Sequence, residues 1–172
     1  MHGFYGRILK IDLDKEAFGI APADDHILKT YLGGRGLATR LLLDHNPPQV
    51  DPLSPENHLI FAAGPLTGSP IWGSCRHGVY TKSPQTGYFS ESYSGGTVAE
   101  HMNATGFDAI LIRGAAAKPL WIEICEESVY FHPAQDLWGQ DTFETEDRIK
   151  KGKRRCQSVS KHGHAHAGRY HE

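Results

Sequence analysis

Glycine, serine and threonine crowd one segment of the sequence, residues 64–96, together with two cationic side chains, Arg76 and Lys82. Glycine lets a backbone approach a ligand closely and adopt φ > 0, and consecutive turn conformations aim N–H groups into an anion-binding nest. The guanidinium of Arg76 is a planar fork that suits phosphate, and the ammonium of Lys82 is a point charge. The segment therefore predicts a main-chain cradle for a large, polar, phosphate-bearing ligand.

A purely structural interpretation of these glycines stays open, because the turns of a β-rich domain need the same residues. Neither common phosphate-loop pattern, G-x-G-x-x-G or G-x-x-x-x-G-K-[ST], occurs in the chain. A second glycine group, GGRG at residues 33–36, favours a break between two helices over a phosphate loop.

Short β-forming segments separated by Gly/Pro turns must position this cradle. We expect strands at residues 4–13, 17–21, 58–63, 78–82, 87–90, 109–113, 120–124 and 129–132. We expect helices at 26–32, 37–43, 96–104 and 141–150, the first preceded by Asp24 and the last opened by a capping-box-like Asp-Thr-Phe-Glu. This pattern predicts an all-β or α+β domain built on antiparallel sheets with a few short helices.

The composition of the chain changes at about residue 150. Residues 1–150 have the apolar content of one domain, whereas residues 151–172 are basic, rich in histidine and almost without large apolar side chains. Such a tail cannot bury enough surface to offset its ordering entropy, so we expect it to be disordered. In this part of the chain, His162, His164 and His166 could bind a metal weakly, and residues 150–155 (KKGKRR) could bind nucleic acid or an acidic surface. An incidental solvated tail is the simpler interpretation of both features.

Overall charge and hydropathy exclude several classes of partner. The formal net charge of the 172 residues is −2, so no global basic field favours nucleic acid or a membrane surface. No apolar run approaches the length of about 20 residues that spans a bilayer. The N-terminus has no basic region followed by an apolar region, so we expect a cytoplasmic location rather than secretion.

The cysteines do not form a recognisable ligand set. Cys75, Cys125 and Cys156 are far apart in the sequence, and no C-x-x-C pair exists. The chain therefore offers no pattern typical of an iron–sulfur cluster or a structural zinc site. We predict no metal-ligating residue and no catalytic residue from the sequence.

Several stretches of the chain form a recognisable series. They are YGRILKIDL near the start, YLGGRGLATRLLL at 31–43, VDPLSPENHLIFAAGPLTG at 50–68, TKSPQTG at 81–87, SGG at 94–96, ATGFDAILIRGAAAKPLWI at 104–122 and LWGQDTFETE at 137–146. In their order and spacing they resemble the N-terminal domain of the tungstopterin-dependent aldehyde:ferredoxin oxidoreductase family. The resemblance runs to about residue 150 and is expected to stop there.

The resemblance implies an α+β, β-rich fold in which two antiparallel sheets form a pterin-binding base. In that family a tungsten ion, held by the dithiolenes of two pterins, lies across the base. Members oxidise aldehydes to carboxylic acids with water as the oxygen source and pass electrons through a [4Fe–4S] cluster to ferredoxin. The cofactor carries the chemistry, and the protein binds and orients it. Tungsten and molybdenum are not distinguished, because no side chain here need ligate the metal.

The resemblance also implies cofactor-binding residues. Arg76 lies where the family carries a pterin-contacting arginine, and Gly95 lies on a contacting glycine of the SGG turn. Tyr93 occupies a contacting position at which close relatives often have Asn, so a main-chain contact would survive there and a side-chain contact would be lost. Trp72, in a segment that departs from the usual small residues, would either crowd the pterin or stack on it.

These observations lead to three hypotheses. The chain is first expected to be an N-terminal fragment of an oxidoreductase, contributing the platform and inactive alone, because the cluster ligands and catalytic domains of the family have no counterpart in it. The second hypothesis is a stand-alone pterin-binding module or a subunit of a split enzyme, paired with a separately encoded remainder. The third is a non-functional gene remnant.

Overall fold

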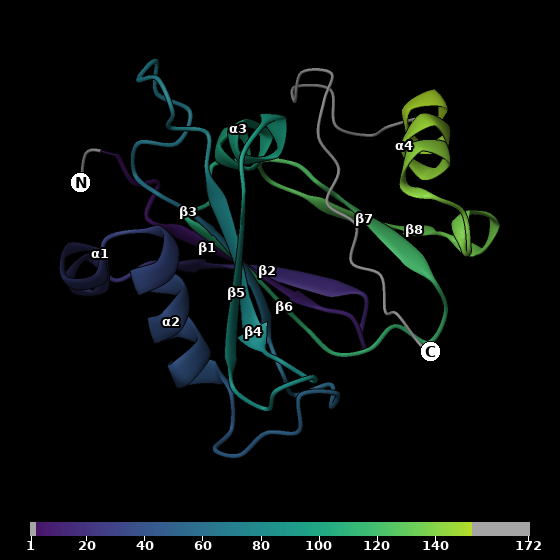
Figure 1. Ribbon diagram of the computed structural model, residues 1–172, viewed down its shortest axis with the longest axis horizontal. Helices are drawn as coiled ribbons and strands as arrows, with labels where there is room; N and C mark the ends of the chain where they lie inside the picture. Colours follow the sequence, from purple (N-terminus) through teal and green to yellow (C-terminus); the bar gives the residue numbers. More distant parts are fainter. Residues whose placement is uncertain (1–2, 153–172) are drawn as a thin grey trace.

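The structure, a computed structural model, describes residues 3–152, which form two sheets and four α-helices (Figure 1). The strands are β1 (Arg7–Asp12), β2 (Ala17–Pro22), β3 (Leu59–Ala63), β4 (His77–Lys82), β5 (Phe89–Ser94), β6 (Ala109–Arg113), β7 (Leu120–Ile124) and β8 (Val129–Pro133). The helices are α1 (Asp25–Tyr31), α2 (Gly34–His45), α3 (Thr97–Ala104) and α4 (Thr142–Lys151), with a 3-10 turn at Gln135–Leu137. The expected α+β, β-rich fold with two sheets is confirmed.

One strand pair departs from the expected antiparallel arrangement. The larger sheet has the order β2-β1-β6-β3-β4-β5, and every pair in it is antiparallel except β1–β6, which is parallel. Parallel strands need a long crossover, and the whole stretch from β2 to α3 provides it. The Asp108 carboxylate, just before β6, accepts hydrogen bonds from the backbone N–H groups of residues 5–7 at 2.8–3.2 Å and so holds the two strands in register. The sheet is therefore mixed.

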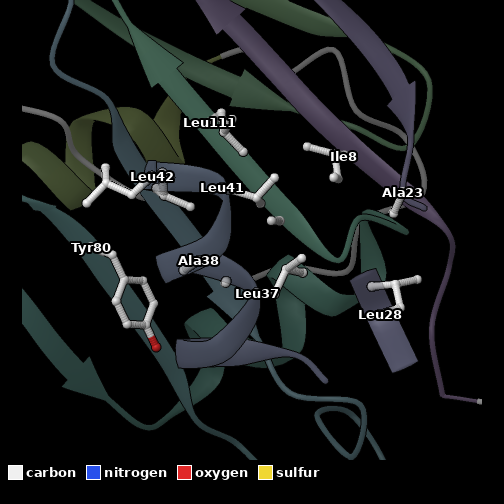
Figure 2. Packing of buried hydrophobic residues seen from close by; sticks show 12 residues of the cluster. Ile8, Ala23, Leu28, Leu37, Ala38, Leu41, Leu42, Tyr80 and Leu111 are labelled. Atoms are coloured by element: carbon white, nitrogen blue, oxygen red, sulfur yellow. The ribbon is translucent and has the colours of Figure 1, made fainter. Parts of the chain in front are cut away.

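Each face of the larger sheet is covered by different elements. The face covered by α1 and α2, which we call the α2 face, buries a core that includes Leu37, Leu41, Ile60, Tyr80 and Leu111 (Figure 2). The opposite face, the α3 face, packs against α3 and the β7–β8 hairpin through a second core. The second core consists of Leu9, Ile11, Ala63, Met102, Phe107, Ile110, Ile112 and Val129. Side chains alternate between the two faces of a strand, so burial of both faces requires apolar residues at successive positions of the central strands.

Two aspartates begin helices as the sequence predicts. The Asp24 carboxylate accepts a hydrogen bond from the backbone N–H of His26 at 2.7 Å. The Asp141 carboxylate accepts one from the N–H of Glu144 at 2.8 Å, which is the N-cap bond of the expected capping box. Each bond satisfies a first-turn donor that the helix itself leaves without a partner.

The expected break between two helices is present, but it lies at Leu32 and Gly33, so only the first residue of the GGRG segment (33–36) belongs to it. Helix α1 ends at Tyr31 and α2 begins at Gly34, with Gly33 as its N-cap. A Cβ at Gly36 would lie 2.1 Å from the Tyr31 carbonyl oxygen, and one at Gly33 would lie 2.7 Å from the Ala63 carbonyl oxygen. Both glycines are therefore required by close backbone approach rather than by a ligand.

Some sequence predictions fall outside residues 3–152. These are most of the tail expected at residues 151–172, the His162–His166 run, and half of the basic segment 150–155. They stay predictions. Among the described helices, none combines the length and the apolar character that crossing a bilayer requires.

Candidate cofactor-binding site

The predicted site lies at the open end of the β4–β5 hairpin. The last residue pair of this ladder is His77 opposite Ser94, and Arg76 and Gly95 are the next residues on the two strands. A Cβ built on Gly95 would lie 3.9 Å from Nε of Arg76 and 3.6 Å from the Cys75 carbonyl oxygen. The fold thus brings together two predicted residues that are separated by the whole hairpin in sequence. We call this edge of the sheet the platform end.

Arg76 presents a cation at the platform end. Its side chain is exposed, and within residues 3–152 its guanidinium makes no ion pair or hydrogen bond. Its backbone carbonyl accepts a hydrogen bond from Oγ1 of Thr67 at 3.2 Å, which ties the loop before β4 to the strand. The backbone is therefore held while the guanidinium keeps all its donors for a ligand, as a phosphate-binding arginine needs.

The N-terminus of α3 lies beside this arginine. Gly96, its N-cap, has φ +81°, a left-handed value that favours glycine, and provides no side chain to accept from the first-turn N–H groups. A Cβ on Gly96 would meet nothing within 4 Å, so the backbone here faces open space. Free N–H groups and the helix dipole both favour an anion at such a position. Figure 1 shows α3 and the β3–β4 loop at the same end of the sheet.

Tyr93 belongs to the same hairpin, but protein contacts already engage its side chain. It lies opposite Gly78, and its hydroxyl donates to Oε2 of Glu91 at 3.1 Å. Glu91 in turn pairs with Arg35 at 2.9 Å. The Tyr93 ring, 48% exposed, meets the Tyr80 ring edge-on at a centroid distance of 6.0 Å. Its backbone is two residues from Gly95, so the main chain remains the available contact at this position.

Two buried polar atoms of β4 lack hydrogen-bond partners among the described residues: Nδ1 of His77 and the hydroxyl of Tyr80. Burial lowers the pKa of His77 and favours its neutral form. Burial also raises the pKa of Tyr80, with the neighbouring Tyr93 as a smaller contribution. The Tyr80 ring folds back over Gly78, where a Cβ would lie 2.2 Å from the hydroxyl oxygen.

Sequence reasoning counted Gly78 only among the glycines of residues 64–96 and did not single out Tyr80, although a signal that groups both with Arg76 was present. Residues 76, 78 and 80 alternate along β4, and side chains at such spacing share one face of a strand. The register places residues 91 and 93 of β5 on that same face. An alternation analysis that started from Arg76 would therefore have placed Gly78 and Tyr80 on the same face of the strand as Arg76.

Other residues singled out in the segment lie elsewhere. Lys82 is at the far end of β4, about 17 Å along the strand from the platform end, and its ammonium donates to the backbone carbonyl of Val50. Trp72 is 100% exposed on the loop before β4. Cys75 is a free, half-buried thiol. Among residues 3–152, no group of three or more His, Cys, Asp or Glu side chains is arranged to hold a metal ion.

This arrangement of a cationic arginine, a glycine turn and an uncapped helix offers donors that suit an anion, and comparison with known proteins identifies the family of the chain. A family model described as "Aldehyde ferredoxin oxidoreductase, N-terminal domain" matches residues 8–168. The chain belongs to the aldehyde ferredoxin oxidoreductase family and corresponds to its N-terminal domain. The match runs past residue 150, where the resemblance was expected to stop.

Curated relatives and a solved structure agree with this assignment. The tungsten-containing aldehyde ferredoxin oxidoreductase of Pyrococcus furiosus is 42% identical over 88% of this chain and 25% of its own length. The enzyme of the same name from Pyrococcus horikoshii is 36% identical over 98% of this chain and 31% of its own. The active-site complex BamBC of benzoyl coenzyme A reductase, solved with 1,5-dienoyl-CoA, superposes with a TM-score of 0.84 at 38% identity. It covers 87% of this chain and 23% of that one. The chain thus spans about a quarter to a third of the curated enzymes it matches.

Proposed function

We propose that this chain supplies the base on which a tungsten bis-pterin cofactor lies, as the N-terminal part of an aldehyde-oxidising enzyme. The observation that carries the proposal is the position of Arg76 beside Gly95, with the guanidinium free and the N-terminus of α3 adjacent. In this proposal Tyr93 contacts the cofactor through its main chain. The names of the tungsten-containing relatives support the metal, and the pterin is our extension from the resemblance.

The residues present fit such a group. A phosphate of the pterin would be held by the Arg76 guanidinium and the first-turn N–H groups of α3. Gly95 has no side chain to block a flat ligand, and a Cβ there would occupy the space next to Arg76. When bound, the cofactor supplies the two-electron oxidation of an aldehyde to a carboxylic acid. This chain binds and orients the cofactor at the platform end and contributes no proton-transferring group to the proposal.

The remaining steps belong to parts of the enzyme that lie outside the matched region. We propose that electrons leave through a [4Fe–4S] cluster, which the resemblance implies, to ferredoxin, which the relatives' names mention, and that residues 3–152 do not provide the cluster ligands. We therefore expect this chain alone to have no aldehyde oxidation activity. A separately encoded remainder of the enzyme is the partner we propose to test. A cytoplasmic location stays an expectation from the sequence.

The experiment compares the chain expressed alone with the chain expressed together with the rest of a family enzyme. Tungsten is measured by mass spectrometry and pterin by the fluorescence of its oxidised form. We expect Arg76→Gln and Gly95→Ala each to lower the amount of bound pterin at least about tenfold. The first variant removes a charged contact, and the second adds a methyl group where the ligand approaches the backbone. The apoprotein should keep its stability, since Arg76 is exposed and an alanine Cβ at residue 95 meets only ordinary contacts.

Arg148→Gln, on α4, is the matched control, because it removes an exposed arginine outside the site. Equal pterin loss in this control would contradict a specific role for Arg76. Bound pterin on the chain alone would support a stand-alone binding module. The platform hypothesis is abandoned if neither tungsten nor pterin accompanies the chain under either condition.

A further inference from the structure

A groove lies at the other end of the larger sheet, away from Arg76. Its volume is about 470 Å³, within the range of small-molecule sites. Strand register fixes its place: β6 ends at Arg113, opposite the start of β3, while Arg76 precedes the start of β4. Because β3 and β4 are antiparallel, these two positions lie at opposite ends. The groove is thus separate from the proposed cofactor base.

The groove exists because the elements that cover the α2 face stop short of its β1–β2 side. Helix α2 packs on β3, β4 and β6. On β2, the residues that line the groove include Ala17 and Gly19, which leave space beside the strand. Lys10 and Leu111 form part of its wall, and His45 and His58 line the α2 side.

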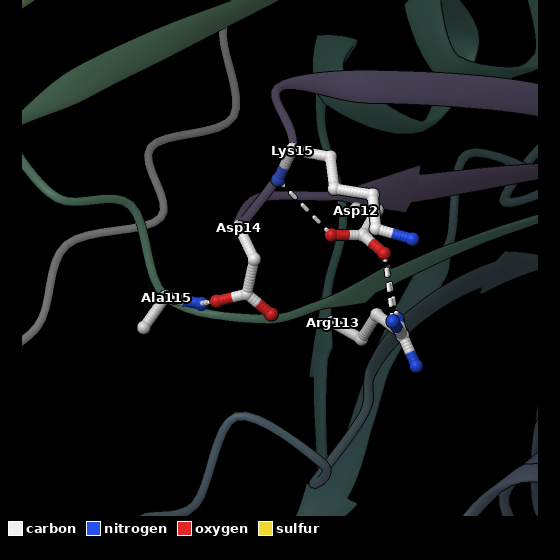
Figure 3. Close-up of polar contacts among 5 residues, drawn as sticks. All are labelled: Asp12, Asp14, Lys15, Arg113 and Ala115. Carbon is white, nitrogen blue, oxygen red and sulfur yellow. Dashed lines mark hydrogen bonds and ion pairs between the residues drawn. The ribbon is translucent and has the colours of Figure 1, made fainter.

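The charge of the groove is positive. Among residues 3–152, the charged side chains that line it are those of Lys10, Lys15 and Arg113 and one carboxylate, Asp12. Asp12 is already neutralised: its Oδ2 accepts from Nη2 of Arg113 at 2.7 Å and from Nε at 3.1 Å (Figure 3). The Arg113 guanidinium lowers the pKa of Asp12, so this carboxylate is ionised and fully paired at neutral pH. Three cations against one paired carboxylate leave two charges to be balanced, which suits a dianion.

Before any ligand arrives, protein contacts hold the side chains of Lys10 and Arg113, whereas for Lys15 only the backbone is anchored. The Lys10 ammonium donates to Nε2 of His45 at 3.0 Å, and Nδ1 of His45 donates to the Leu41 carbonyl oxygen at 2.9 Å. The turn that carries Lys15 is anchored at both ends (Figure 3). The N–H of Lys15 donates to Oδ1 of Asp12 at 3.2 Å, and Oδ1 of Asp14 accepts from the N–H of Ala115 at 2.9 Å.

Several donors remain available on these side chains. The Lys10 ammonium uses one of its three N–H groups on His45, and the guanidinium of Arg113 uses Nε and Nη2 on Asp12, which leaves Nη1. Among residues 3–152, the Lys15 ammonium has no hydrogen-bond or ion-pair partner. A phosphate oxygen accepts strongly from all three kinds of donor.

His58 does not add to the positive charge of the groove. Oδ1 of Asn46 accepts a hydrogen bond from the His58 backbone N–H, so this amide oxygen is an acceptor. Nδ1 of His58, 2.9 Å from the same oxygen, is therefore the donor of their hydrogen bond. Burial, followed by the charges of neighbouring groups, lowers the pKa of His58. The cationic donors of the groove are therefore lysine and arginine side chains.

We propose that this groove binds a small molecule carrying a phosphate group, through Lys10, Lys15 and Arg113. The ligand is either free inorganic phosphate or a phosphate ester whose organic part lies along Ala17, Gly19 and Leu111. The site is independent of the proposed cofactor base, and nothing in it depends on tungsten or pterin.

The test is a titration of the ¹⁵N-labelled full chain with inorganic phosphate and, separately, with phenyl phosphate, at constant ionic strength. We expect saturable shifts of the amide signals of Lys10, Gly19 and Leu111. Binding should weaken by about tenfold or more in Lys10→Gln and in Lys15→Gln, because each loses a charge-assisted hydrogen bond. Tighter binding of phenyl phosphate identifies an ester ligand, and equal binding identifies free phosphate.

Lys29→Gln is the matched control, since this exposed lysine lies on α1 outside the groove and pairs with Asp25. Both groove lysines are exposed, so the variants should fold, and far-UV circular dichroism checks this. The proposal is overturned if no saturable shift occurs up to roughly 50 mM ligand. It is equally overturned if Lys29→Gln weakens binding as much as Lys10→Gln does, which would indicate a general charge effect. Signals at residues 76 and 95 report separately on the platform end.

Discussion

His77 and Tyr80 lie three residues apart on β4, so their side chains point to opposite faces of the sheet. Each side chain buries a polar atom that has no hydrogen-bond partner among the described residues. An unpaired buried polar group costs about 1–3 kcal/mol, so proteins keep one only where something else requires it. Tyr80 also fills the core beneath α2, and its ring volume is needed there. The ring and the hydroxyl can therefore be tested separately.

We expect Tyr80→Phe to stabilise the apoprotein by about 1 kcal/mol, because it keeps the ring and removes a buried hydroxyl that has no partner. The free energy of unfolding in urea measures this effect. Tyr93→Phe is the control: its hydroxyl bonds to Glu91 at a half-exposed position, and its loss should change stability by less than about 0.5 kcal/mol. A clear loss of stability in Tyr80→Phe would mean that the hydroxyl has a partner after all.

At the scale of elements, hydrogen bonds at the helix ends divide the helices into two kinds. Helices α1 and α4 begin with aspartates whose side chains accept first-turn N–H groups, whereas α2 and α3 begin at glycines without such a bond. The glycine at α2 is explained by close backbone approach to Ala63. The glycine at α3 has open space around it, which is why we assign the start of α3, and not that of α2, to ligand binding.

The cap of α4 gives an element-scale prediction. Asp141→Ala should lower stability by about 1 kcal/mol, because the N–H of Glu144 loses its acceptor. Asp147→Ala, an exposed change in the same helix, should leave stability within about 0.5 kcal/mol. Thermal unfolding of both variants makes the comparison. Equal effects would show that the lost charge, and not the lost cap, matters.

At the scale of the whole molecule, our two proposals put an anion-binding position at each end of the larger sheet. The platform end presents Arg76 and the start of α3, and the opposite end presents the Lys10, Lys15 and Arg113 groove. Two buried histidines, His58 and His77, belong to these two ends, and burial lowers the pKa of both. Both are therefore neutral in the folded protein at pH values at which they would be protonated in the unfolded chain.

This difference predicts how stability depends on pH. The usual pKa of a histidine side chain is about 6.5, and burial lowers the pKa of both histidines below it in the folded protein. Below about pH 6.5 the unfolded chain binds more protons than the folded one, so stability is lost as pH falls from there towards the folded pKa values. Above that window the two states bind these protons equally. The slope should not exceed about 1.4 kcal/mol per pH unit for each histidine.

Urea unfolding between about pH 5 and pH 8 measures the slope. His77→Gln should have a smaller slope below pH 6.5 than the parent chain, whatever its absolute stability. A parent slope of zero, or an unchanged slope in the variant, would contradict the assignment of this dependence to buried histidine.

The sequence by itself determined the local structure well. Residues 109–113 and 120–124 were predicted as strands with the bounds that β6 and β7 have, and Asp141 was predicted to cap α4. These features depend on side chains within a few residues of one another, so their causes are visible in a short stretch of chain. The family resemblance then placed Arg76, Tyr93 and Gly95 together.

Only the tertiary structure decided what those elements do together. Pairing of β1 with β6 joins residues about a hundred positions apart, and no local pattern encodes it. The same pairing puts Asp12 beside Arg113 and so creates the cationic groove, which sequence reasoning did not find. The hairpin register turns Arg76 towards Gly95 and carries Lys82 to the far end of β4, although both cations had been read as one cradle. Side-chain alternation and strand register are properties of paired strands, and a single sequence does not state which strands pair.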